Sequence, residues 1–146
     1  MIDVNYPLRK IYYAALSTLT YNDLPLKAFY QKAPDNIEDS NYIVFGGISN
    51  TDQSSKSNSD TDTSIRVTVH TFRDKFNDGS AADAIAGLIF SVIYPNATDR
   101  ADMSADNLQL VGTILSGDFV QNYNIQGNRE YVDRVLTFKH RIFQQS

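Results

Sequence analysis

The sequence lacks cysteine altogether, and it holds no tryptophan and only two histidines among its 146 residues. Without cysteine the chain forms no disulfide and no cysteine-ligated zinc site, a usage that fits a reducing compartment. So few histidines leave little material for general acid–base catalysis or metal binding near neutral pH. These absences narrow the candidate chemistry before any motif is considered.

Long hydrophobic runs are also missing. No segment approaches the roughly 20 apolar residues that span a membrane, and residues 1–7 show no basic region followed by an apolar stretch, so we expect no membrane segment and no signal peptide. The net charge of −4 disfavours general affinity for nucleic-acid phosphates. Hydrophobic residues make up 42% of the chain, enough for one core, and we predict a single domain over residues 1–146.

Motifs for catalysis and cofactor binding are absent as well. No serine lies in a Gly-x-Ser-x-Gly turn, and no glycine-rich phosphate loop occurs, so we assign no catalytic residue and no cofactor. Asp60 and Asp62, with Asp52 upstream, are spaced as in a calcium loop, but the central glycine and final glutamate of that pattern are missing. A solvated loop is therefore the preferred interpretation, and no metal site is assigned.

The first third of the chain predicts one helix and two short strands. Asn5 is placed to cap a helix that ends at residues 22–23. Residues 25–31 alternate as a short strand, residues 42–45 form a compact β-prone run, and the following Gly46 and Gly47 indicate a bulge. The apolar stripe expected on the helix is Leu8, Ile11, Tyr12, Ala15, Leu16 and Leu19.

A polar segment separates the next two strands. Residues 50–62 are rich in Ser, Asn, Asp and Thr, so we interpret them as a loop or the tip of an arm within a β-hairpin. Residues 63–72 alternate as the clearest strand. Ser80 then caps a second helix, with Asp83 resembling the partner of a capping box, and Pro95 ends it. Its expected buried stripe is Ala81, Ala84, Ile85, Leu88, Ile89 and Val92.

The last segment, residues 107–143, reads as one long β-hairpin with its turn around residues 127–128. Leu136, Phe138, His140 and Ile142 share one face of its second strand, and the intervening residues share the other. The element order predicts an α+β fold, a two-layer sandwich in which two helices cover one face of a mainly antiparallel sheet. The long C-terminal β-hairpin completes that sheet.

Two functional alternatives rest on charged or titratable residues. His70 lies on the polar side of its strand, where a nearby carboxylate would make it the centre of a small ligand-binding or enzymatic domain. Because no motif surrounds it, an ordinary strand histidine is the preferred interpretation. Four basic residues define a candidate nucleic-acid module, although surface ion pairs or contacts with an acidic neighbour are the preferred explanation. These residues are Arg66, Arg134, Lys139 and Arg141.

The chain is rich in other aromatic residues, with nine tyrosines and eight phenylalanines. A two-layer core does not readily bury all of them, and tyrosine, phenylalanine and arginine are enriched in the cores of protein interfaces. We therefore expect subunit contacts on the outer side and tip of the hairpin. The candidate interface residues are Phe72, Phe119, Tyr123, Arg129, Tyr131, Lys139, Arg141 and Phe143.

The same pattern resembles the tail-terminator and tail-completion (neck) proteins of tailed bacteriophages. The opening helix at residues 8–16 and the strand Tyr42-Ile-Val-Phe-Gly46 carry the resemblance first. The strand at residues 65–72, the helix at residues 81–93 and the closing strand at residues 134–140 extend it over almost the whole chain. The family pattern has proline before the strand tyrosine, where this chain has Asn41.

The resemblance implies a structural role and no enzymatic activity. Such proteins are small α+β subunits that form a homo-oligomeric ring of six or twelve copies at the head–tail joint or tail end. The implied partners are other neck, tail or portal-adaptor proteins, with only passive proximity to the genomic DNA. The implied location is the virion, assembled in the host cytoplasm.

Overall fold

The computed structural model describes residues 3–54, 59–74, 76–93, 103–124 and 129–144. The helical elements are α1 (Asn5–Leu16), α2 (Ser80–Ile93) and the 3-10 helix η1 (Ser104–Asp106). The strands are β1 (Thr20–Tyr21), β2 (Leu24–Pro25), β3 (Lys27–Tyr30), β4 (Asn41–Asp52), β5 (Asp60–Arg73), β6 (Leu108–Asn124) and β7 (Glu130–Gln144).

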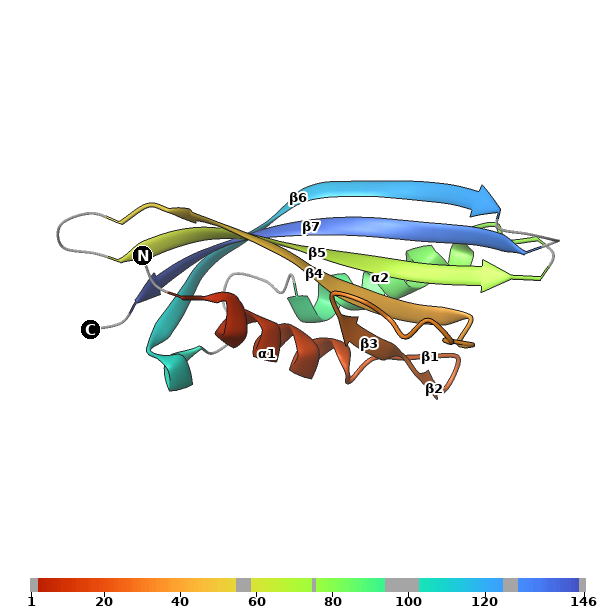
Figure 1. Ribbon diagram of the computed structural model, residues 1–146, viewed down its shortest axis with the longest axis horizontal. Helices are drawn as coiled ribbons and strands as arrows, with labels where there is room; N and C mark the ends of the chain where they lie inside the picture. Colours follow the sequence, from red (N-terminus) through yellow and green to blue (C-terminus); the bar gives the residue numbers. More distant parts are fainter. Residues whose placement is uncertain (1–2, 55–58, 75, 94–102, 125–128, 145–146) are drawn as a thin grey trace.

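Five strands form one sheet in the order β3-β4-β5-β7-β6, while β1 and β2 pair separately. Every pair in the large sheet is antiparallel except β3–β4, which is parallel. Figure 1 shows α1 and α2 on the same side of this sheet. The predicted α+β fold, with two helices against one face of a mainly antiparallel sheet, is confirmed. We call the side with the helices the helix side and the opposite side the open face.

Helix α1 begins and ends differently from the prediction. Asn5 is its first helical residue rather than its cap, and Asp3 Oδ1 accepts a hydrogen bond from the Asn5 backbone N–H at 3.1 Å. The helix ends at Leu16 rather than at residues 22–23. Asn22 and Asp23 have positive φ angles of 51° and 63° and connect β1 to β2. They form a two-residue hairpin turn, which suits asparagine and aspartate and is incompatible with a helix.

The bulge after the compact strand is confirmed. The register of β4 against β5 shifts between Gly46 and Ser49. Gly47 has φ +60°, and a side chain on Gly46 would meet the backbone of Gln31 at 3.3 Å. Glycine is favoured here because Gly47 is left-handed and a side chain on Gly46 would crowd a neighbouring backbone.

The polar segment at residues 50–62 is more structured than predicted. Strand β4 continues to Asp52, and β5 already begins at Asp60. Asp60 and Thr61 are buried, since Asp60 to Arg73 pair with β7 along their whole length. The predicted loop is therefore wrong at both of its ends, because the pairing of β4 with β5 and of β5 with β7 stabilises strand structure that local composition disfavours.

Helix α2 spans the predicted residues, but its buried stripe is rotated. Ala84 is exposed and Asp83 points to Arg134 instead of closing a capping box. The backbone N–H of Ser80 donates to Asp78 Oδ1 at 3.0 Å, so the aspartate two residues earlier supplies the bond at the helix start. The buried residues of α2 are Ala81, Ala82, Ile85, Ala86, Ile89 and Ile93.

The C-terminal hairpin of β6 and β7 is confirmed; its predicted turn at residues 127–128 lies outside the described residues. Leu136, Phe138 and Ile142 are fully buried on the helix side, as predicted. They pack with Ile65 and Val67 of β5 in the core between sheet and helices. Among the described residues, no helix combines the length and the apolar character needed to cross a membrane.

Candidate interaction surface

The predicted interface residues lie on or beside the open face. Strand register places seven of them there, because each alternates with a core-facing neighbour along β5, β6 or β7. They are Phe72, Phe119, Tyr123, Tyr131, Lys139, Arg141 and Phe143. The eighth, Arg129, precedes β7 and places its guanidinium 4.7 Å from the centre of the Phe72 ring.

An aromatic group forms one end of this face. Tyr123 stacks on Tyr131 with ring centres 5.0 Å apart, and Phe72 lies 5.5 Å from Tyr131. With Arg129 over Phe72, four predicted interface residues are in one contiguous group. A hollow of about 290 Å³ lies beside it, lined by Asn77, Asn122, Tyr123, Glu130, Tyr131 and Val132. Aromatic rings grouped with arginine are typical of interface centres.

His70 lies next to a buried carboxylate on the same face. Its Nδ1 is 3.1 Å from Asp133 Oδ1, and its ring stacks on Tyr42 at 4.9 Å. The Tyr123 hydroxyl donates to Asp133 Oδ2 at 2.9 Å. Burial and the Asp133 charge raise the pKa of Tyr123 well above its ordinary value. The structure therefore supplies the carboxylate that the His70 hypothesis requires. Neither His70 nor Asp133, however, lines the hollow beside the aromatic group.

At the other end of β7, Arg141 holds Asp60. Arg141 Nη2 and Nε lie 2.6 and 2.9 Å from Asp60 Oδ2, and this bond raises the pKa of the guanidinium. Asp60, one of the aspartates of the calcium-loop pattern, therefore forms an ion pair with an arginine. Within the described segments, no group of three or more His, Cys, Asp or Glu side chains is placed to hold a metal ion.

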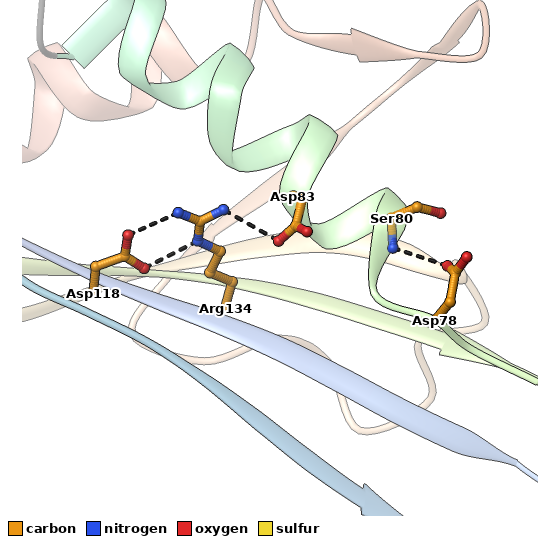
Figure 2. Close-up of polar contacts among 5 residues, drawn as sticks. All are labelled: Asp78, Ser80, Asp83, Asp118 and Arg134. Carbon is orange, nitrogen blue, oxygen red and sulfur yellow. Dashed lines mark hydrogen bonds and ion pairs between the residues drawn. The ribbon is translucent and has the colours of Figure 1, made fainter.

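Arg134 lies on the helix side, where it connects three elements. Figure 2 shows its guanidinium between Asp118 of β6 and Asp83 of α2. It binds both Asp118 oxygens, at 3.0 and 2.7 Å, and these bonds lower the pKa of the Asp118 carboxyl. The four basic residues of the nucleic-acid hypothesis consequently do not form one patch, because Arg134 faces away from Arg66, Lys139 and Arg141.

Strand β6 is an edge of the sheet and exposes large apolar side chains. Ile114, Phe119 and Val120 are 54%, 54% and 53% exposed. Asp118 is the strand's single charged residue, and Arg134 already binds it. Soluble proteins usually protect long edge strands with charges or proline. The prediction included Phe119 but missed Ile114 and Val120, whose exposure depends on where β6 lies in the sheet.

A second hollow, the α1–β3 hollow, lies at the opposite edge of the sheet. It measures about 260 Å³, and Phe45 is part of its lining. The Arg9 guanidinium lies 5.0 Å from the Tyr6 ring centre and 4.9 Å from that of Tyr30. The remaining lining residues are Lys10 and Tyr13. Sequence reasoning missed this site, although Tyr6, Arg9, Lys10 and Tyr13 follow the spacing of one helix face.

Comparison with known proteins identifies a shared fold. No model of a protein family matches the chain, and no curated protein sequence matches it. Among solved structures, the chain is similar to one chain of a structure described as the virion of a native gene transfer agent particle. The TM-score is 0.58 at 18% sequence identity, and the match covers 96% of this chain and 91% of that one. At this identity the likeness shows the fold.

Proposed function

We propose that the chain is a structural protein of a phage-like virion. The observation that carries this proposal is the fold similarity to a chain of a gene transfer agent virion, which extends over 96% of this chain and 91% of the other. Because the match covers most of both chains, it compares whole subunits rather than a shared fragment. A structural role requires no catalytic residue.

Within the virion, we propose a ring of six or twelve copies at the head–tail joint or tail end, in contact with neck, tail or portal-adaptor proteins and assembled in the host cytoplasm. Two features support a ring. The apolar β6 edge and the α1–β3 hollow lie at opposite edges of the sheet and are unlike surfaces, and head-to-tail rings need unlike surfaces that complement each other. The eight predicted interface residues remain our candidates for these contacts.

Mass measurement tests the ring directly. The purified chain, alone and mixed with the other virion proteins, is weighed by native mass spectrometry. The expected result is a closed oligomer of six or twelve chains, alone or with a neighbour. A chain that stays monomeric in every mixture contradicts the ring.

A second candidate, a small ligand-binding or enzymatic domain, is favoured by the 3.1 Å approach of His70 to the buried Asp133. The substitution His70→Ala separates the two proposals. A structural subunit keeps its incorporation into particles when His70 is replaced, while a catalytic or ligand-binding domain loses its function. Loss of particle infectivity with unchanged incorporation would favour the second candidate.

A further inference from the structure

The helix layer leaves part of the β6 edge uncovered. Helix α1 packs on β3 and β4, and α2 packs on β5 and β7. Register places Asp118 and Val120 on the helix side of β6, yet Val120 is 53% exposed. Within the described residues, α2 reaches this part of β6 through Asp83, which meets Arg134 beside Asp118, but it leaves the Val120 side chain half exposed.

The opposite edge shows the complementary arrangement, a helix face with exposed aromatic side chains. Tyr6 and Tyr13 of α1 are 54% and 56% exposed on either side of Arg9. Within the described part of the chain, no carboxylate forms an ion pair with Arg9, whose guanidinium lies between the Tyr6 and Tyr30 rings. A cation held between aromatic rings beside an apolar hollow fits a carboxylate flanked by apolar side chains.

We infer that the α1–β3 hollow of one copy receives residues 118–120 of β6 from a second copy, so that α1 covers the exposed helix side of its neighbour's edge strand. This inference rests on the proposed virion ring and names the two surfaces that close it. Val120 enters between Tyr6 and Tyr13, and Arg9 approaches Asp118, whose carboxylate has lone pairs beyond those that Arg134 uses.

The strand directions agree with this contact. Strand β6 runs antiparallel to β7, β7 to β5 and β5 to β4, while β3 runs parallel to β4. Copies related by rotation about an axis along the strands therefore bring β6 antiparallel to β3 of the next copy. The contact is heterologous, which is the kind that closes a ring.

A charge-exchange experiment tests the contact. Arg9→Glu places a carboxylate against Asp118, and Val120→Lys places an ammonium against Arg9. Each single variant is expected to weaken self-association of the full chain, measured by sedimentation velocity, by about tenfold or more. The double variant is expected to return to within about threefold of the wild type, because the introduced lysine meets the introduced glutamate. An equimolar mixture of the two single variants is expected to recover as well.

Arg66→Glu is the matched control, since it reverses an exposed arginine that lies on the central strand β5, away from both edges of the inferred contact, and is expected to leave association unchanged. Circular dichroism checks that each variant is folded, and Tyr13→Ser tests the hollow without a charge if Arg9→Glu fails to fold. Self-association that Arg9→Glu and Tyr13→Ser leave intact overturns the inference while the virion role stands. A wild-type chain that never self-associates, even at high concentration, also overturns it. A chain absent from virions contradicts the proposed function itself.

Discussion

At the scale of single residues, the most unusual group in the interior is a buried, neutral histidine. His140 of β7 is 2% exposed, with its Nε2 bonded to the Tyr12 hydroxyl of α1 and its Nδ1 2.9 Å from Thr113 Oγ1 of β6. A neutral imidazole offers one donor and one acceptor, which these two hydroxyl groups satisfy. Burial lowers the pKa of His140 to about 4, so the ring is uncharged at neutral pH.

This histidine predicts a loss of stability in mild acid. Between pH 6.5 and about 4, the unfolded chain binds a proton at His140 and the folded chain does not. Its contribution is therefore complete above pH 6.5 and is lost as the pH falls through this window, by up to about 3 kcal/mol. Urea unfolding across this range measures the slope, and His140→Gln is expected to flatten it. A histidine NMR titration that places His140 near 6.5 would contradict this account.

At the scale of secondary-structure elements, the β1–β2 turn is the clearest test of local conformation. Asp23 has φ 63°, a left-handed conformation that glycine adopts at no steric cost. We expect Asp23→Gly to raise the free energy of unfolding by about 0.5 kcal/mol. Asp23→Ala is the matched control and is expected to lower it, because alanine has no polar side chain with which aspartate generally tolerates left-handed conformations. The prediction is wrong if the alanine variant is at least as stable as the glycine variant.

Arg134 predicts a second effect between elements. Replacing it with glutamine removes both guanidinium bonds to Asp118 and the contact to Asp83. Because water partly screens this group, we expect a loss of only about 1 kcal/mol, with faster hydrogen exchange in β6 around Asp118. Lys32→Gln breaks the exposed pair with Asp35 and is the control. Unchanged exchange in β6 of the Arg134 variant would mean that the edge strand is held by its pairing with β7 alone.

The order and type of most elements could be predicted from the sequence, because β5 and β7 alternate strictly and α2 is strongly apolar on one side. The environment of Asp118 and Val120 could not. Register shifts between Leu110 and Gly112 and between Leu115 and Gly117 each reverse which side of β6 the later residues face. The two reversals cancel for Asp118 and Val120, so counting in twos from Leu110 places both on the helix side, but it wrongly places Ile114 there as well. The ion pairs of Arg134 with Asp118 and with Asp83 depend on how α2 packs against the sheet, which counting along a strand does not reveal.

At the scale of the whole molecule, two unlike surfaces lie at opposite edges of one sheet. The β6 edge exposes apolar side chains, and the α1–β3 hollow presents Arg9 between tyrosines. In the inferred contact these two edges meet head to tail, and the rotation between successive copies decides whether the assembly closes. The proposed virion role and the inferred contact are consistent with this geometry, while His70 and Asp133 require no reaction to explain their proximity.

The virion role is tested most directly by the protein content of purified particles. Particles made by cells that carry the gene are separated on a density gradient, and the chain is quantified by mass spectrometry against the most abundant virion protein. We predict that the chain follows the particles through the gradient at a constant ratio of six or twelve copies per particle, as one ring requires. A chain that remains in the soluble fraction, or whose ratio to particles varies across the gradient, would contradict a structural role in the virion.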